Sequence, residues 1–125
     1  MIRSLPDTNV FSKIFAGDSR LRDVIEASHA VIDTTIFIEC IQGSKSDTEK
    51  RKIKKYLDNF PLLLITPEIS QRAITLIDRY SNSFGLFLPD ALIAATALEN
   101  DLTIITYNIV DFKFIEGLSW ESPSD

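Results

Sequence analysis

Cysteine and histidine are nearly absent from this chain, which holds one of each among its 125 residues. The single cysteine, Cys40, excludes a disulfide within the chain and fits a reducing compartment. The single histidine, His29, argues against a histidine-based catalytic triad and against a zinc site with several histidine ligands. Any chemistry in this chain must therefore be carried by other side chains.

Long apolar runs are absent as well. No stretch approaches about 18 uncharged apolar residues, so we expect no membrane-spanning helix. The segment 1–6 lacks the long apolar core of a signal peptide, so we expect a cytoplasmic protein. No linker rich in proline or glycine divides the chain, and its length fits one domain over residues 1–125.

The apolar residues alternate between helical spacing and short continuous runs. Strands are expected at 1–5, 29–32, 62–65 and 102–105, and the run at 62–65 is expected to be buried. Helices are expected from Val10, at 19–27, at 36–42 with Thr34 and Thr35 as caps, at 46–60, from Pro67, and from Pro89 to about residue 100. Short apolar strands that alternate with helices predict an α/β fold with a parallel sheet covered on both faces.

Three acidic residues stand out by their surroundings. Asp7 follows the first expected strand, Glu39 is the only charge in 36–41, and Asp90 is the only charge in 84–98. A charge in an apolar helix is costly to bury unless it is paired or binds a metal. Each acid also has a purely structural interpretation: Asp7 as a helix cap, Asp90 as a partner of the helix dipole, and Glu39 at the solvent edge of its helix.

The segment 106–111 follows the last expected strand and adds a further acid, Asp111, whose structural alternative is a turn residue. Carboxylate and amide oxygens are hard ligands that suit Mg²⁺ or Mn²⁺. Ions held in this way activate water and screen a phosphate during in-line displacement. The acids therefore predict a metal-dependent nuclease site.

Four segments, in this order, resemble the PIN-domain ribonucleases, and among them the VapC-type toxins of toxin–antitoxin pairs. They are DTNV at 7–10, IFIECIQG at 36–43, PDALIAATA at 89–97 and TYNIVDF at 106–112. The resemblance covers nearly the whole chain. It implies a three-layer α/β/α sandwich with a short, mainly parallel central sheet.

The resemblance also implies an activity, cleavage of RNA with Mg²⁺ or Mn²⁺ that leaves a 5′-phosphate and a 3′-hydroxyl. Structured RNAs such as tRNA are substrates by analogy, and the expected partners are a cognate antitoxin and a second copy of the chain. Carried over by position, the catalytic residues are Asp7, Glu39, Asp90 and Asp111, with Asp7 and Asp90 as direct metal ligands and Thr8, Asn9, Thr106 and Asn108 in support. Asn108 is the alternative to Asp111 as the fourth position of the site.

A basic stretch at 45–55, in which six of 11 residues are Lys or Arg, follows the Glu39 segment. We expect Lys50, Lys52 and Lys54 to bind RNA phosphates; the alternative is a solvent-exposed helix face.

Two other functions of the protein stay open at this stage. One is a catalytically inactive PIN domain that only dimerises and binds a partner. The other is a phospho-acceptor receiver domain, which also gathers acids at strand ends.

Overall fold

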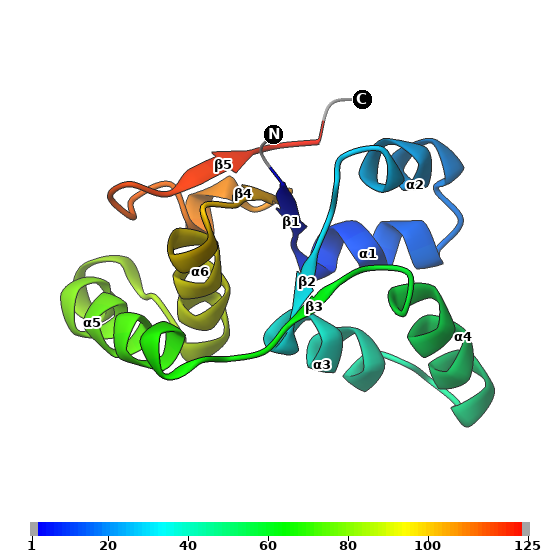
Figure 1. Ribbon diagram of the computed structural model, residues 1–125, viewed down its shortest axis with the longest axis horizontal. Helices are drawn as coiled ribbons and strands as arrows, with labels where there is room; N and C mark the ends of the chain where they lie inside the picture. Colours follow the sequence, from blue (N-terminus) through cyan, green and yellow to red (C-terminus); the bar gives the residue numbers. More distant parts are fainter. Residues whose placement is uncertain (1–2, 124–125) are drawn as a thin grey trace.

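The computed structural model describes residues 3–123, which form five short strands and six α-helices (Figure 1). The strands are β1 (Ser4–Pro6), β2 (Ile32–Asp33), β3 (Leu62–Leu63), β4 (Thr103–Ile105) and β5 (Ser119–Glu121). The helices are α1 (Thr8–Phe15), α2 (Ser19–Glu26), α3 (Thr34–Gln42), α4 (Asp47–Leu57), α5 (Pro67–Phe84) and α6 (Leu88–Asn100), and a 3₁₀ turn, η1 (Ile109–Asp111), follows β4. Residues 1 and 2 of the expected first strand lie outside the described residues.

All strand pairings are parallel, and β1 lies in the middle. β1 pairs with β4, β4 with β5, and β2 with β3. A bridge between Ser4 and Ala30 joins β1 to the β2–β3 pair, with Val31 N donating to the Ser4 carbonyl at 2.9 Å. The spatial order is therefore β3-β2-β1-β4-β5. A receiver domain of the flavodoxin-like kind has β3 beside β1, so this order excludes the phospho-acceptor alternative.

The helices cover the sheet on two sides, as Figure 1 shows. α1 to α4 follow β1 and β2 and lie to the right of β1, whereas α5 and α6 connect β3 to β4 and lie to the left. This confirms the expected three-layer arrangement with a short parallel sheet. The core between the layers includes the fully buried side chains of Leu5, Phe11, Ile104 and Phe112.

Five of the six described α-helices begin directly after a residue whose side chain accepts a backbone N–H, and α6 is the exception. Asp7 caps α1, Ser46 caps α4 and Thr66 caps α5. The prediction that Thr34 and Thr35 cap the third helix is wrong, because Asp33 Oδ1 accepts from Ile36 N at 2.8 Å. An N-cap residue bonds the amide three positions later, so the cap is Asp33 and both threonines lie inside the helix.

The prediction of a buried strand at 62–65 is also wrong. β3 ends at Leu63, and the side chains of Leu62 and Leu64 are 45% and 65% exposed. β3 is the last strand on its side of the sheet and pairs only with β2 in the described part of the chain. An apolar run does not by itself distinguish such an edge strand from a central one. β5 at the opposite edge was not expected from the sequence.

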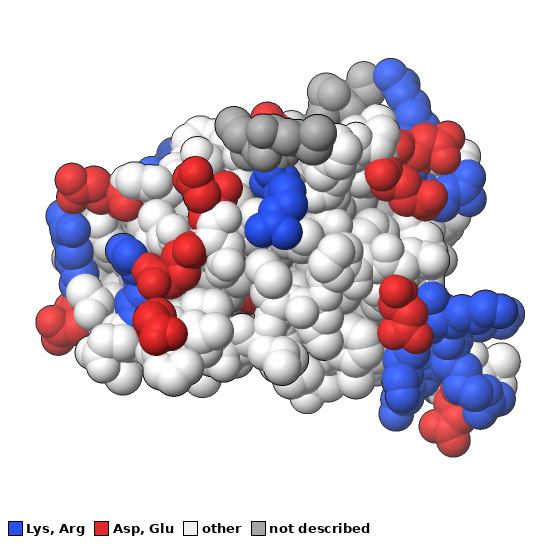
Figure 2. Space-filling model, in the orientation of Figure 1, with Lys and Arg blue, Asp and Glu red and all other residues white. Residues whose placement is uncertain are grey.

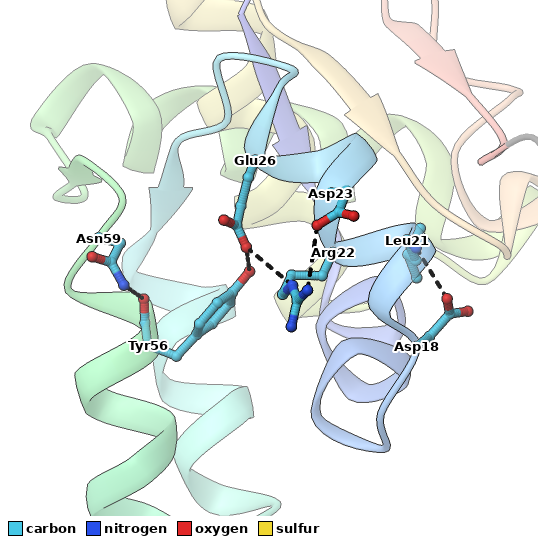
Figure 3. A network of polar contacts seen from close by, with 7 residues as sticks. All are labelled: Asp18, Leu21, Arg22, Asp23, Glu26, Tyr56 and Asn59. Atoms are coloured by element: carbon cyan, nitrogen blue, oxygen red, sulfur yellow. Dashed lines mark hydrogen bonds and ion pairs between the residues drawn. The ribbon is translucent and has the colours of Figure 1, made fainter.

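The basic helix α4 is held against α2 by a small polar network (Figure 3). The Tyr56 hydroxyl donates to Glu26 Oε2 at 3.0 Å, and Arg22 Nε lies 3.7 Å from the same oxygen. Burial and the neighbouring Glu26 raise the pKa of Tyr56, so the phenol keeps the proton that it donates.

Among residues 3–123, no helix is long and apolar enough to cross a membrane.

Candidate functional site

The predicted site residues gather where the strand order changes direction. The chain continues from β1 to β2 on one side of β1, and it later returns to β4 on the opposite side of β1. The connections that leave the carboxyl ends of β1 and β4 therefore run in opposite directions and leave a crevice between them. Crevices at such switch points are the usual ligand sites of open parallel sheets. Asp7 directly follows β1, and its backbone N–H donates to the Ile105 carbonyl at the end of β4 at 2.8 Å.

Both carboxylate oxygens of Asp7 are held in place. Oδ1 accepts from Thr8 N at 2.8 Å, which is the helix cap, and Oδ2 accepts from Thr106 Oγ1 at 2.9 Å. Burial raises the pKa of Asp7, nearby Glu39 and Asp111 add to the rise, and the two hydrogen bonds oppose it. Asp7 is therefore a helix cap and also part of an acidic cluster; the two interpretations of this residue are compatible.

Asn9, Thr106 and Asn108 form a set of hydrogen bonds around Asp7. Asn9 Nδ2 donates to Thr106 Oγ1 at 3.2 Å and lies 3.4 Å from Asp7 Oδ2. The backbone N–H of Asn108 also donates to Thr106 Oγ1, at 3.0 Å. Because Thr106 is fully buried, its hydroxyl joins the ends of β1 and β4 without help from solvent.

Glu39 enters the site from α3. Thr8 Oγ1 donates to Glu39 Oε1 at 2.6 Å, which links the first turn of α1 to the middle of α3. Glu39 is half-buried, so its carboxylate borders both the protein interior and solvent. A cavity of about 230 Å³ between α3 and α6 is lined by Glu39, Thr35, Ile38 and Pro89 among others.

Asp90 lies in the first turn of α6 and is half-buried. Burial is the largest cause that raises the pKa of Asp90, and the neighbouring charges of Asp7, Asp111 and Glu39 raise it further, to about 7. A cap or a helix-dipole partner would not require three acidic neighbours. The four predicted acids thus act on one another electrostatically at the end of the sheet.

Asp111 is exposed and belongs to the 3₁₀ turn after β4. Its charge raises the pKa of both Asp7 and Asp90, whereas Asn108 contributes a backbone N–H to Thr106. Between the two alternatives for the fourth position, the electrostatics favour Asp111.

Asp33 was missed in the sequence. It is fully buried at the end of β2, and its Oδ2 has no hydrogen-bond partner within the described residues. Burial, with smaller contributions from Glu39 and Asp7, raises the pKa of Asp33 to about 6. The signal was present: an acid follows the apolar run 30–32 and precedes a helix, as Asp7 does after β1.

The acids fit a hard divalent cation by chemistry and charge. Within residues 3–123, no group of three or more His, Cys, Asp or Glu side chains is placed so that it could hold a metal ion. Mg²⁺ commonly uses only one or two carboxylates and keeps several waters, so a partial oxygen shell suits it. A divalent cation would also relieve the repulsion that raises the pKa of Asp90.

The predicted RNA-binding lysines lie on α4, where Figure 2 shows Lys and Arg gathered at the lower right. Lys50, Lys52 and Lys54 are all exposed. Lys52, together with Lys45, lines a cavity of about 540 Å³ between α1 and α4. A smaller adjoining cavity of about 140 Å³ shares Phe15 and other walls with it and reaches Glu39. Lys50 and Lys54 line neither cavity.

An apolar hollow of about 770 Å³ lies between α5 and α6 and is lined mostly by aliphatic and aromatic side chains, without a charged residue. At its rim, Phe87 is 75% exposed and Leu88 is 63% exposed. Large exposed apolar patches mark interaction surfaces in soluble proteins. Leu88 also lines the cavity beside Glu39, so this surface reaches the acidic site.

Comparison with solved structures gives three close matches in fold. A chain in a toxin–antitoxin complex from Klebsiella pneumoniae is 30% identical, with 92% of this chain and 94% of that chain covered and a TM-score of 0.78. DNA-bound VapBC from Salmonella typhimurium gives 20% identity, 98% of each chain and a TM-score of 0.82. VapBC2 from Rickettsia felis, bound to a DNA fragment from their promoter, gives 21% identity, 99% and 100% coverage, and a TM-score of 0.81. A search of curated proteins found no match.

The family comparison agrees with the geometry. The model of the PIN domain matches residues 4–115, a range that includes β1 through β4, the four acids and the hydrogen bonds around Asp7. The chain therefore belongs to the PIN domain family.

Proposed function

We propose that the protein is a metal-dependent endoribonuclease and the toxin of a VapC-type toxin–antitoxin pair. The observation that carries the proposal is the convergence of Asp7, Glu39, Asp90 and Asp111 at the switch point of the sheet, where burial and mutual repulsion raise the pKa of Asp90 to about 7. Acidic charges that raise the pKa of a half-buried carboxylate at a ligand-binding edge are unfavourable unless a cation is bound there. PIN domains are nucleases as a class, which agrees with this chemistry.

Asp7 and Asp90 would hold Mg²⁺ or Mn²⁺, and Glu39 and Asp111 would complete or orient its water shell. A bound cation would lower the pKa of a coordinated water and would supply a positive charge that screens the phosphate. Thr106, Thr8, Asn9 and Asn108 act through the acids as positioning residues. Hydrogen bonds of this kind fix the orientation of metal-binding carboxylates.

The hydrogen bonds that the carboxylate oxygens of Asp7 and Glu39 already accept suggest what each residue would do in the reaction. Thr106 and Thr8 N hold the two oxygens of Asp7, so this carboxylate cannot rotate. Thr8 holds Oε1 of Glu39, which leaves Oε2 to accept a hydrogen bond from the attacking water. In-line attack on the phosphodiester would then release a 3′-hydroxyl and leave a 5′-phosphate on the other fragment.

Substrate and partners belong to the same proposal. The lysines of α4, with Lys52 nearest to the cavity that leads toward Glu39, would bind phosphates of an RNA, with tRNA as a candidate. A cognate antitoxin would block this access. The matched chain from Klebsiella pneumoniae belongs to a toxin–antitoxin complex, which supports such a partner.

A second copy of the chain would bind at the apolar hollow between α5 and α6. Phe87 and Leu88 project beside a hollow lined by Ile74 and Ile77, so the same patch offers a projection and a receptor. Such self-complementarity is what a twofold-symmetric interface requires.

Cleavage of a labelled RNA pool tests the function, with Mg²⁺, with Mn²⁺ and with EDTA. We expect metal-dependent cleavage by the wild type and none by Asp90→Asn. Asp101→Asn is the matched control, since it is the same change at the exposed C-terminal end of the same helix. Cleavage that persists in Asp90→Asn or in EDTA would contradict the assignment. Absence of cleavage together with absence of Mg²⁺ binding in calorimetry would favour the inactive, partner-binding alternative.

A further inference from the structure

A lysine and a tyrosine lie together beside the acidic site. Lys13 Nζ is 4.2 Å from the centroid of the Tyr107 ring. Lys13 follows Asn9 by one turn of α1, and Tyr107 follows Thr106 at the end of β4. Lys13 is exposed and Tyr107 is half-buried, so the pair borders solvent. The role of this pair is not explained by the nuclease chemistry described above.

Tyr107 is tied to the acids through its backbone. Its N–H donates to Asn9 Oδ1 at 3.3 Å, and the amide nitrogen of the same Asn9 side chain donates to Thr106 Oγ1. Thr106 in turn donates to Asp7 Oδ2. The backbone of Tyr107 is therefore linked to the Asp7 carboxylate by a continuous set of hydrogen bonds.

Lys13 provides a positive charge in the last turn of α1, one helical turn after Asn9. The neighbours that shift the pKa of Asp7 and of Asp90 by their charge are all acids. A polyanion that approaches this region therefore meets repulsion from four carboxylates. Within residues 3–123, Lys13 contacts an aromatic ring and is in none of the ion pairs, so its ammonium group can turn to a phosphate without breaking a salt bridge.

We propose that Lys13 and Tyr107 form a nucleotide-binding subsite for single-stranded RNA, in which the ring stacks on the base next to the cleaved bond and the ammonium group binds that nucleotide's phosphate. The proposal rests on the proposed nuclease function and names residues that position its substrate. An aromatic ring beside a cation is the combination that binds a base and its phosphate in single-stranded nucleic acids.

The subsite gives the cleavage reaction a direction along the RNA. The backbone of Tyr107 is bonded through Asn9 and Thr106 to the Asp7 carboxylate, so a base stacked on the Tyr107 ring would place the adjoining phosphodiester near the acids. Stacking is tolerant of sequence because every base has a π face. A purine next to the cleaved bond stacks over a larger area, so we expect purines to be preferred there.

Binding of a fluorescein-labelled, single-stranded oligoadenylate, followed by anisotropy with Ca²⁺ in place of Mg²⁺, tests the subsite. Tyr107→Leu keeps an apolar side chain but removes the π face, and we expect roughly tenfold weaker binding. Tyr107→Phe retains the ring and is expected to bind as the wild type does. Thermal unfolding of each variant separates lost binding from lost folding.

Lys13→Gln is expected to weaken binding and to lower the slope of log K against log salt concentration by about 0.7, the share of one phosphate contact on a single strand. A purely structural lysine would leave that slope unchanged. Arg20→Gln, an exposed cation on α2, is the matched control and is expected to change neither quantity.

The outcomes separate the subsite from the function on which it rests. Wild-type affinity and salt slope in both Tyr107→Leu and Lys13→Gln, in a protein that binds and cleaves RNA, would overturn the subsite and leave the nuclease intact. Variants that bind RNA normally but fail to bind the antitoxin would assign the pair to a protein contact and also overturn it. A wild type that neither binds nor cleaves RNA would remove the nuclease function and the subsite together.

Discussion

Replacing Asp90 with Asn is expected to stabilise the metal-free protein although it removes a residue of the proposed site. Burial and the charges of Asp7, Asp111 and Glu39 raise the pKa of Asp90 from 3.8 to about 7. Keeping this carboxylate ionised in the folded chain therefore costs free energy that the unfolded chain does not spend. Asparagine has nearly the same shape and no charge, so the variant avoids that cost.

The size of the effect follows from the shift. Roughly three pH units at about 1.4 kcal/mol each set a ceiling of about 4 kcal/mol. The side chain is only half-buried, and solvent screens its interactions, so we expect about 1–2 kcal/mol. For a chain of this length, 1 kcal/mol corresponds to about 4 °C in Tm, which gives a rise of about 4–8 °C.

The pH dependence has a defined sign. Because the folded pKa of Asp90 is raised, the folded state binds this proton more tightly than the unfolded state does. The stability that the folded state gains by binding this proton is fully present below about pH 4 and is lost as the pH rises through about 7. Asp90→Asn lacks this loss, so the Tm difference between variant and wild type should be large at about pH 8 and small at about pH 4.

Thermal unfolding followed by circular dichroism in EDTA measures this difference, with Asp78→Asn, at an exposed position within α5, as the control for the substitution itself. Adding Mg²⁺ should raise the Tm of the wild type and narrow the gap, because a bound cation relieves the same repulsion. A Tm for Asp90→Asn at or below that of the wild type at about pH 8, or a difference independent of pH, would refute the electrostatic reasoning.

Three further predictions concern single side chains. Thr106→Val removes a fully buried hydroxyl that joins Asp7 to β4, so urea denaturation should show a loss of stability of about 1–3 kcal/mol and the cleavage rate should fall. Thr106→Ser retains the hydroxyl and should keep most of the stability and most of the cleavage rate. Equal stability of the two variants would contradict this prediction. Asp33→Ser keeps an oxygen that can cap Ile36 N but removes a buried carboxylate whose pKa is raised to about 6. Urea denaturation above that pH should therefore show the variant to be about 1–2 kcal/mol more stable than the wild type, with no gain below about pH 4. A variant that is less stable than the wild type at high pH would count against this reasoning. Leu88→Glu places a charge at the apolar hollow between α5 and α6, so size-exclusion chromatography with light scattering should show a monomer in place of a dimer. A dimer that is unchanged in this variant would mean that the interface lies on another surface.

Much of the site could be predicted from local sequence. Asp7, Glu39 and Asp90 each stand alone in an apolar context, and such isolation is visible without knowledge of the fold. In the structure, the charges of Asp7, Glu39 and Asp111 all raise the pKa of Asp90, which agrees with the set of acids that the resemblance implied. Their catalytic and metal-binding roles stay predictions.

What the sequence could not supply depends on strand order. The bond from Tyr107 N to Asn9 joins positions 98 residues apart, and no local pattern specifies that β4 lies beside β1. The exposure of Leu62 has the same origin, because an apolar run reads alike in an edge strand and in a central strand. Asp33 was a different kind of omission, since its pattern matched that of Asp7 but the adjacent threonines offered a simpler cap.

The hydrogen bond between Thr106 and Asp7 spans 99 positions of the chain, and this separation has a consequence for biosynthesis. Closing so large a loop is slow relative to local helix formation, so the native contacts around Asp7 should be among the last to form. A nascent chain that has not yet released residues 103–121 lacks β4 and β5 and therefore has no neighbour on that side of β1. Fragments that end before residue 103 then carry three of the four acids but no assembled site, and the site can form only after residues 103–121 have emerged.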